Sequence, residues 1–449
     1  MRGFVPTPAA IVDQMVEQLF ARRPPGPEAD VLDPGCADGV FIDGILRWCA
    51  RSGKELPRIT GVELHPGRAA NARARFAGVP QVRVVTDDFL WGSLPRFDYI
   101  VGNPPYVPIT GLDLEEKARF RSAFVTASGR FDLYVLFWER ALGLLKPGGR
   151  LAFITPEKYL TVESARPLRR LLAARSVAEV RLLPEDSFPG LTTYPTITLV
   201  DADRHASRTH LVLRDGRERS VVFDAAGSSL APAMYADGPL ASGETVLGDI
   251  CLRISCGVAT GADALFVQPT AKLTGGLHDH ARPTVSGRQL PPGGGPLAPV
   301  DSILMPYDGR GQLLPFDTLN GLGDYLQSHK RRLLQRTCAR TKPWYAFHET
   351  PPLSELLRPK ILFKDITEHP RFWVDAVGQL VPRHSVYYAV PYDSAHVEAL
   401  AVYLNGLESS AWLMAHCQRV RKGFIRLQST TLKQLPVPSS FRQSDGGSA

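Results

Sequence analysis

The tetrapeptide Asn103-Pro104-Pro105-Tyr106 has the clearest chemical content in this sequence of 449 residues. Two successive prolines fix the backbone and remove two N–H donors, so the loop displays carbonyl acceptors, one amide and one aromatic ring. The Asn103 side-chain oxygen and the Pro104 carbonyl can both accept from an exocyclic NH2 group, and the Tyr106 ring can stack on the heterocycle that bears it. Such contacts direct the lone pair of the amino nitrogen at an electrophile. The motif predicts a site for a planar guest with an amino group.

Three further acidic motifs follow apolar runs. The glycine-rich turn at 33–41 begins with Asp33 and departs from GxGxxG, which disfavours a dinucleotide pyrophosphate site. Glu63 lies 30 residues later, where an acid can take both hydroxyls of a ribose. Asp87-Asp88-Phe89 come after the next run, and a carboxylate and an aromatic ring there can hold the amino group and ring face of an adenine.

The elements that position these motifs alternate between strand and helix from residue 31 to about 200. Such alternation is typical of a parallel, doubly wound sheet with helices on both faces. The expected strands are 31–35, 59–64, 82–88, 97–103, 150–156, 178–183 and 195–200. The expected helices are 40–50, 66–77, 115–125, 131–145 and 162–174.

The second half of the chain has a different texture. Residues 201–245 are polar and rich in Gly, Ala and Ser, which indicates a connecting region, and Gly and Pro are dense from 276 to 296. Only 394–416 has a helical period again, and the last residues are typical of a frayed tail. We expect a loop-rich second domain.

Charge is also unevenly distributed. Residues 1–245 hold 30 Lys and Arg against 29 Asp and Glu, whereas residues 246–449 hold 22 against 16, so the second half supplies +6 of the net charge of +7. A polyanionic partner for this half is one interpretation. A genome that encodes arginine often is the other, because 41 of the 52 basic residues are arginine.

Several classes of protein are disfavoured. The 44% hydrophobic and 22% charged residues exclude a mainly disordered chain. The six cysteines form no CxxC pair or Cys/His cluster, so we expect no metal and reduced thiols. The first residues lack a signal-peptide pattern, and no run of about 18 apolar residues predicts a membrane span. We expect a cytoplasmic, nucleoid-associated protein of a bacterium or archaeon.

These motifs, in this order, resemble the gamma group of N6-adenine DNA methyltransferases that use S-adenosylmethionine, the group of the TaqI enzyme. The resemblance implies an α/β fold, a Rossmann-like class I S-adenosylmethionine-dependent methyltransferase sheet, followed by a loop-rich α+β target-recognition domain. The implied domains are 1–240 (catalytic), 241–440 (target recognition) and a disordered tail at 441–449. The segments that carry the resemblance are 5–16, 31–41, 60–66, 87–91, 97–107 and 129–160, with looser likeness at 257–267, 358–366 and 424–438.

The resemblance also implies roles for individual residues. Thr7 should meet the methionine carboxylate of the cofactor and Asp33 its amino group, although the turn reads CADG where most relatives have a CGxG-like turn. Glu63 should bind the ribose. The implied cofactor set is Thr7, Asp33, Gly35, Ala37, Glu63, Leu64, Asp88, Phe89, Asn103 and Phe137, in which Leu64 and Phe137 sandwich the adenine and Asp88 and Phe89 contact its amino edge and face. The implied catalytic set is Asn103, Pro104, Pro105, Tyr106 and Phe188.

Phe188 enters that set because an aromatic residue closes the substrate pocket in this group, ahead of a β hairpin. Tyr194 is the alternative, since the loop is longer here than in the TaqI enzyme, and Phe188 as a plain loop hydrophobe is a third reading. No general base is required for the first step, because the methylated nitrogen becomes acidic and loses its proton to water or to the Asn103 and Pro104 contacts.

The implied activity is site-specific DNA-methyltransferase (adenine-specific), EC 2.1.1.72, on double-stranded DNA, in restriction-modification or phage defence. The enzyme is expected as a monomer, with any restriction endonuclease or defence protein a separate partner. The basic residues expected at DNA are Lys330, Arg331, Arg332, Arg336, Arg340, Arg419, Arg421, Lys422 and Arg426, for which a solvated helix face is the alternative. Methylation of RNA adenine or protein glutamine, and a non-catalytic DNA-binding subunit, stay open as rivals.

On this hypothesis, Asn103→Ala lowers methyl transfer by orders of magnitude but still binds the cofactor, because the amide acts on the amino group that accepts the methyl. Transfer rates with labelled cofactor and equilibrium binding of the cofactor measure the two effects. Full activity in this variant would contradict the assignment.

Overall fold

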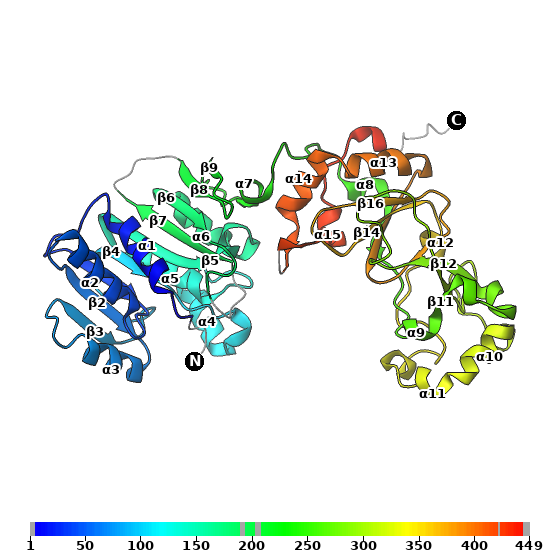
Figure 1. Cartoon of the computed structure of the whole chain (residues 1–449), viewed down its shortest axis with the longest axis horizontal. Helices are drawn as coiled ribbons and strands as arrows, with labels where there is room; N and C mark the ends of the chain where they lie inside the picture. The colour runs from blue at the N-terminus through cyan, green and yellow to red at the C-terminus, as the bar shows by residue number, and fades with distance from the viewer. Residues whose placement is uncertain (1–4, 189–193, 203–207, 421–422, 443–449) are drawn as a thin grey trace. The chain divides into compact units, whose positions relative to one another are not determined.

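The computed structural model describes residues 5–188, 194–202, 208–420 and 423–442 and divides the chain into two compact units, Met1–Met234 and Tyr235–Ala449 (Figure 1). Each unit has hydrophobic cores of its own. The expected tail at 441–449 falls outside the described residues from 443 onward. None of the helices in the described part of the chain is long and apolar enough to cross a lipid bilayer.

The first unit is built on a nine-stranded sheet in the order β3-β2-β1-β4-β5-β7-β6-β8-β9. Strands β3, β2, β1, β4 and β5 run parallel, and β7 is antiparallel to both of its neighbours, β5 and β6. The strands are β1 Asp30–Pro34, β2 Arg58–Glu63, β3 Val82–Thr86, β4 Phe97–Gly102, β5 Leu145–Pro156, β6 Val177–Leu182, β7 Pro195–Asp201, β8 Thr209–Val212 and β9 Glu218–Val221.

Helices cover both faces of this sheet, which explains why its strands read as continuous apolar runs. On one face, α1 and α2 pack against alternate strand residues such as Ala152 and Ile154. On the other face, α5 places Trp138 against Phe153, with ring centroids 5.0 Å apart. The helices are α1 Ala9–Phe20, α2 Val40–Ser52, α3 Pro66–Arg75, α4 Leu114–Ala123, α5 Leu133–Leu144 and α6 Arg166–Ala173.

Buried arginines tie the helices to the sheet. The Arg150 guanidinium is 1% exposed, donates to the carbonyls of Gln18 and Leu19 at the end of α1, and pairs with Asp201 at 3.2 Å. It therefore supplies donors to carbonyls that helix α1 leaves without intrahelical partners. Arg169, equally buried, donates to three backbone carbonyls in the same way.

The second unit combines small sheets with short helices. A four-stranded antiparallel sheet has the order β10-β18-β14-β16, a second has the order β11-β13-β12-β17, and a three-stranded sheet has the order β15-β20-β19. These strands are β10 Cys251–Cys256, β11 Val267–Pro269, β12 Ala281–Val285, β13 Asp301–Leu304, β14 Lys360–Lys364, β15 Ile366–Thr367, β16 Phe372–Asp375, β17 Val381–Pro382, β18 Val386–Pro391, β19 Gln418–Arg419 and β20 Ile425–Arg426. The longer helices are α10 Asn320–Ser328, α13 Val397–Leu404 and α14 Leu407–His416.

A buried ion pair organises the first of these sheets. Lys360 and Asp375 are 0% and 6% exposed, and their Nζ and Oδ2 atoms lie 2.6 Å apart. The Asp375 carboxylate also accepts from the backbone amides of Gly378 and Leu380, which closes the turn after β16. Burial lowers the pKa of Lys360, and the neighbouring carboxylate opposes that shift.

The predicted fold class is confirmed, and every predicted strand and helix of the first unit has a counterpart. The expectation of a parallel sheet was wrong beyond β5, because β7 runs antiparallel to both of its neighbours and β9 runs antiparallel to β8. Residues 201–245, predicted as a connecting region, span the division between the two units and also supply β8 and β9, which extend the sheet beyond β6. The predicted helical stretch at 394–416 is two helices, α13 and α14, separated at Asn405 and Gly406.

Candidate functional site

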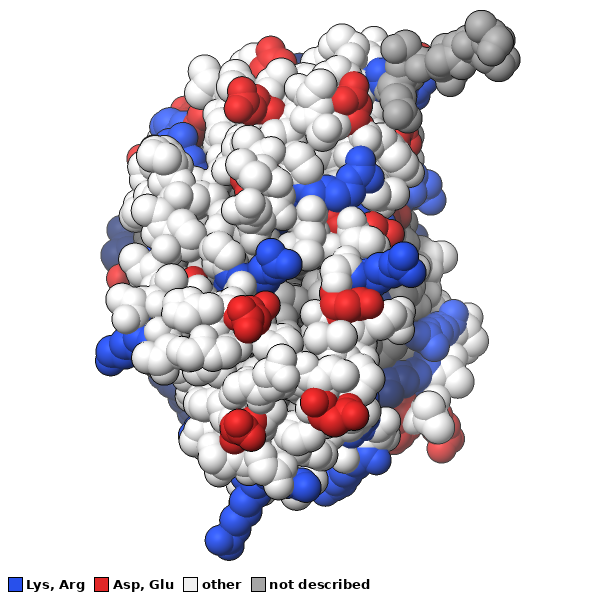
Figure 2. Space-filling model, turned by 90° about the vertical axis from the view of Figure 1, so that its right-hand side faces the viewer, with Lys and Arg blue, Asp and Glu red and all other residues white. Residues whose placement is uncertain are grey.

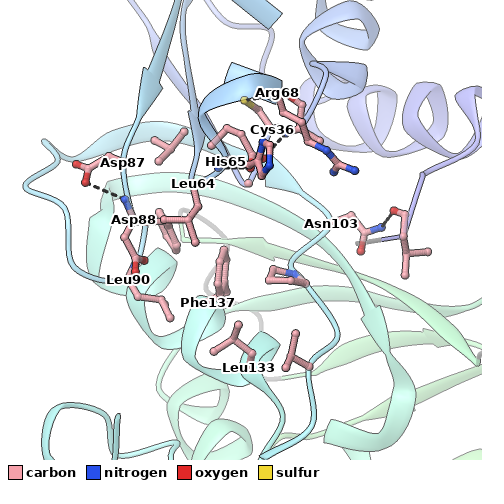
Figure 3. A pocket seen from close by; sticks show the side chains of 18 of the residues that line it. Cys36, Leu64, His65, Arg68, Asp87, Asp88, Leu90, Asn103, Leu133 and Phe137 are labelled. Carbon is pink, nitrogen blue, oxygen red and sulfur yellow. Dashed lines mark hydrogen bonds between the residues drawn. The ribbon is translucent and has the colours of Figure 1, made fainter. Parts of the chain in front are cut away.

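The carboxyl ends of β1, β2, β3 and β4 surround a cavity of about 610 Å³ (Figure 3). Parallel pairing brings these four strand ends to one edge of the sheet, so the motifs that follow them meet in space. Nine of the ten residues predicted for cofactor binding line this cavity, namely Thr7, Gly35, Ala37, Glu63, Leu64, Asp88, Phe89, Asn103 and Phe137.

Glu63 holds the glycine-rich turn in place. One carboxylate oxygen accepts from the backbone amide of Ala37 at 3.0 Å, and the other accepts from that of His65 at 2.8 Å. Ala37 has a φ of +48°, and Gly39 has a φ of +87° at a point where an added Cβ would lie 2.3 Å from the Phe76 ring. Each Glu63 oxygen keeps a lone pair for another donor.

Asp33 lies behind the cavity and is not among the residues that line it. Its carboxylate is fully buried, and neither oxygen has a hydrogen-bond partner among the described residues. Burial, and then the nearby Glu63 carboxylate, raise its pKa well above the ordinary range. A Cβ at Gly102 would lie 3.2 Å from Oδ1, so this glycine leaves the space that the carboxylate needs. An unpartnered buried carboxylate is costly unless a cation or a donor compensates it.

The apolar side of the cavity comes from the ends of β2 and β3 and from α5. Leu64 is 66% exposed, and Leu64 and Phe137 both line the cavity (Figure 3). The ring of Phe137 also packs on that of Phe89, with centroids 4.9 Å apart. Asp88 accepts from the backbone amide of Leu90 at 2.9 Å, and burial raises its pKa.

Asn103 has a defined orientation at the wall of the cavity. Its Nδ2 donates to the Val5 carbonyl and to Thr7 Oγ1, each at 3.0 Å, while its Oδ1 is buried and has no partner among the described residues. The amide nitrogen is therefore engaged, and the oxygen is the atom left to accept a hydrogen bond.

The rest of the NPPY loop packs around this amide. Pro105 lines the cavity, whereas Pro104 and Tyr106 do not. The Tyr106 hydroxyl donates to the Ile154 carbonyl at 3.4 Å, its ring meets Tyr134 edge-on at 6.2 Å, and burial raises its pKa. The hydrogen bond to Ile154 and the contact with Tyr134 thus fix the Tyr106 ring next to the cavity.

The two residues expected to close the substrate pocket do not line the cavity. Phe188 is 2% exposed and belongs to the core cluster that contains Leu183 and Ile197, so its ring is buried with the sheet. Tyr194 lies under the guanidinium of Arg214, 5.1 Å from the ring centroid. Residues 189–193, between them, lie outside the described part of the chain.

Sequence reasoning missed the residues that cover the cavity from α4 and its approach. Leu112, Glu116 and Phe120 line it, and the Phe120 ring stacks on Trp91 at 5.7 Å with an angle of 15°. The sequence of α4 gave no signal for these residues, because the helix has one buried residue, Phe120, and therefore no apolar stripe that would indicate a cavity wall. Val5, Cys36, His65 and Arg68 also line the cavity without having been predicted.

The predicted DNA-contacting residues fall into different groups. Arg331, Arg332 and Arg340 are exposed and have no hydrogen-bond or ion-pair partner among the described residues. Lys330 lies over the ring of Trp344, 5.2 Å from its centroid. Arg421 and Lys422 are outside the described residues.

The side chains of the remaining three predicted residues bond to other groups of the protein. The guanidinium of Arg336 donates to the carbonyls of Thr260 and Trp344, that of Arg419 donates to the Gly423 carbonyl, and that of Arg426 pairs with Asp365 at 3.0 Å. On the face of the second unit seen in Figure 2, Lys and Arg side chains are interspersed with Asp and Glu side chains. Among the described residues, no group of three or more His, Cys, Asp or Glu side chains could hold a metal ion.

Comparison with known proteins identifies relatives. Residues 71–182 match the sequence model of the Eco57I restriction-modification methylase family. The chain is 27% identical to the Type II methyltransferase M.PaeR7I of Pseudomonas aeruginosa, over 97% of this chain and 86% of that one. It is 32% identical to the Type II methyltransferase M.TthHB8I of Thermus thermophilus, over 54% and 53% of the two chains.

A solved structure of the Type IIL restriction-modification enzyme MmeI in complex with DNA matches 95% of this chain and 64% of that one, with a TM-score of 0.54 and 12% identity, which is a likeness of fold alone. The predicted kinship with restriction-modification methyltransferases is confirmed by the sequence relatives.

Asp132, at the start of α5, provides a test of the packing around the NPPY loop. Its backbone pairs with Pro108, and the Leu133 amide donates to the Val107 carbonyl. Burial raises the pKa of Asp132 to about 6, although backbone hydrogen bonds oppose the shift.

Because this pKa is raised in the folded state, the folded protein binds the proton more tightly than the unfolded chain between about pH 4 and about pH 6. The stability linked to that proton is present at low pH and is lost as the pH rises through this window. We expect Asp132→Asn, which cannot ionise, to gain stability relative to the wild type across the window and to keep the gain above it. Urea unfolding at several pH values measures this. Asp186→Asn, the same change at an exposed site, is the control, and a curve parallel to the wild type for Asp132→Asn would show that the carboxylate is not perturbed.

Proposed function

We propose that this chain, which carries an Eco57I-type restriction-modification methylase domain, is a site-specific DNA adenine-N6 methyltransferase that uses S-adenosylmethionine, EC 2.1.1.72. Its role would be the modification step of a restriction-modification system. The orientation of the Asn103 amide carries the proposal. Both amide hydrogens are engaged and the buried oxygen has no partner among the described residues, so the oxygen is the atom of this amide that is left to accept from an amino group.

The cavity suits the cofactor in size and chemistry. Its volume of about 610 Å³ lies within the usual range for small-molecule sites, roughly 300–1,000 Å³. Glu63 has lone pairs left for the ribose hydroxyls, and Leu64 and Phe137 offer apolar surface for the adenine ring. The buried Asp33 carboxyl has no hydrogen-bond partner among the described residues and its pKa is raised, so the positively charged methionine end would supply both a donor and a charge that favours its ionised form.

When bound, S-adenosylmethionine supplies an electrophilic methyl group on a sulfonium. Asn103 Oδ1 and the Pro104 carbonyl accept the two hydrogens of the adenine N6 group and hold its lone pair toward the cofactor site. Hydrogen bonds of this kind strengthen as positive charge develops on the nitrogen. The chain thus contributes positioning and preorganised acceptors, and no side chain is assigned as a general base.

A target base reaches such a cavity only outside the duplex. Flipping the nucleotide costs a few kcal/mol, and stacking on an aromatic ring returns about 1–3 kcal/mol. Tyr106 is the ring proposed for that stacking, because its hydroxyl and its contact with Tyr134 fix its plane beside Asn103. Phe188, which is buried in the core, is not proposed for it.

Incubation with radiolabelled S-adenosylmethionine and unmethylated DNA, tRNA or a release factor tests the proposal directly. Label is expected in DNA alone, and sequencing of N6-methyladenine in an expression host should then reveal one recognition sequence. Label in RNA or protein would establish the rival substrates. Absence of label from all three, with intact cofactor binding, would favour a non-catalytic subunit.

We further propose that Arg331, Arg332 and Arg340 contact DNA phosphates, because they are exposed and no partner within the described structure neutralises them. Replacing all three with Gln should weaken DNA binding and reduce the slope of log K against log salt concentration by about 0.9 for each lost contact. Fluorescence anisotropy of a labelled duplex over a series of salt concentrations measures the slope.

The matched control removes the same charge elsewhere in the second unit, by replacing the exposed Arg282, Arg288 and Arg310 with Gln. The control should change the slope much less. Equal effects of the two triple variants would mean that net charge, and no particular surface, governs DNA binding.

A further inference from the structure

The segment before α1 contacts the amide that carries the proposed chemistry. Thr7 is 7% exposed and lines the cavity, and its Oγ1 accepts from Asn103 Nδ2 at 3.0 Å. The Val5 carbonyl accepts the second hydrogen of the same nitrogen, also at 3.0 Å. Two positions separated by almost one hundred residues in the sequence therefore share one hydrogen-bonded unit.

The Val5 contact determines which end of the amide faces its carbonyl, and the Thr7 hydroxyl, which can accept or donate, holds the amide in that orientation. If the Asn103 amide were turned by 180°, Oδ1 would face the Val5 carbonyl, which can only accept, and Nδ2 would replace the acceptor beside the cavity. In the reversed orientation the amide NH2 group would face the amino group of the ligand, and two hydrogen-bond donors would oppose each other. The segment 5–7 thus selects the orientation in which an exocyclic amine can bind.

The segment is itself held by rigid structure. Pro6 and Pro8 flank Thr7 and restrict its backbone, and Pro8 leads directly into α1. Helix α1 is fixed at its far end by the Arg150 guanidinium and packs Phe20 against Tyr99 of β4, with ring centroids 5.2 Å apart. Since Asn103 follows β4, the two partners of the amide contact are attached to the same packed core.

We infer that Thr7 is a positioning residue for methyl transfer, which acts by holding the Asn103 amide with its oxygen toward the amino group of the substrate. The inference rests on the proposed function for its kinetic consequence. It adds to the role expected from the family resemblance, in which Thr7 meets the methionine carboxylate of the cofactor. The Thr7 hydroxyl can serve both, because it accepts from Nδ2 and still has its own hydrogen to donate into the cavity.

The contact can be measured without cofactor or DNA. The chain has four asparagines, Asn71, Asn103, Asn320 and Asn405, so selective 15N labelling yields few side-chain amide signals, and loss of one pair in Asn103→Ala assigns Asn103. In the wild type both Asn103 amide hydrogens should exchange slowly with solvent. Thr7→Val, which keeps the side-chain volume but removes the acceptor, should accelerate exchange, and Thr7→Ser should restore protection. Unchanged exchange in a folded Thr7→Val protein would overturn the inference.

The kinetic test separates positioning from cofactor contact. At saturating S-adenosylmethionine, kcat of Thr7→Val should fall by about tenfold or more, whereas kcat of Thr7→Ser should stay within about threefold of the wild type. A loss confined to the KM for the cofactor, with kcat recovered at saturation, would overturn the inference and leave Thr7 as a cofactor contact. If the wild type methylates no substrate, the proposed function fails, while the exchange experiment still decides whether Thr7 orients Asn103.

Discussion

Parallel pairing of β1, β2, β3 and β4 is the constraint on which the site depends. Parallel strands that are adjacent in a sheet end at the same edge, so the glycine-rich turn, Glu63, Asp88 and Asn103 converge although they are spread over about 70 residues. The helices that connect the strands cover both faces and leave this edge open. One topological fact thus explains the position of the cavity and the identity of most residues around it.

Buried polar groups hold this arrangement together and also prepare it for a ligand. Arg150 and Arg169 satisfy backbone carbonyls that would otherwise be buried without donors, so helices and loops are attached to the sheet at defined points. The Asp33 carboxylate and Asn103 Oδ1 are the opposite case, because they are buried and left without partners. Such groups lower the stability of the folded protein, and a ligand that brings a complementary donor or cation removes this destabilisation.

In the second unit, arginine has two different uses. Arg336, Arg419 and Arg426 hydrogen-bond to carbonyls or pair with a carboxylate, and so they stabilise loops in a unit whose sheets are small. Arg331, Arg332 and Arg340 lack such partners within the described structure. The positive charge of this half is therefore partly structural, and a count of basic residues overstates the charge available to a polyanion.

The sequence by itself determined the fold class and nine of the ten residues predicted for cofactor binding, because the alternation of strands and helices predicts the fold and the motifs at the strand ends carry the family resemblance. The orientation of Asn103 was decided by tertiary structure alone, since Val5 and Thr7 reach it through the packing of α1 on the sheet. The same holds for the cover that α4 provides, for the burial of Phe188, and for which arginines stay exposed. Each depends on contacts between segments distant in the chain, and no local pattern encodes which side chain a distant backbone carbonyl will meet.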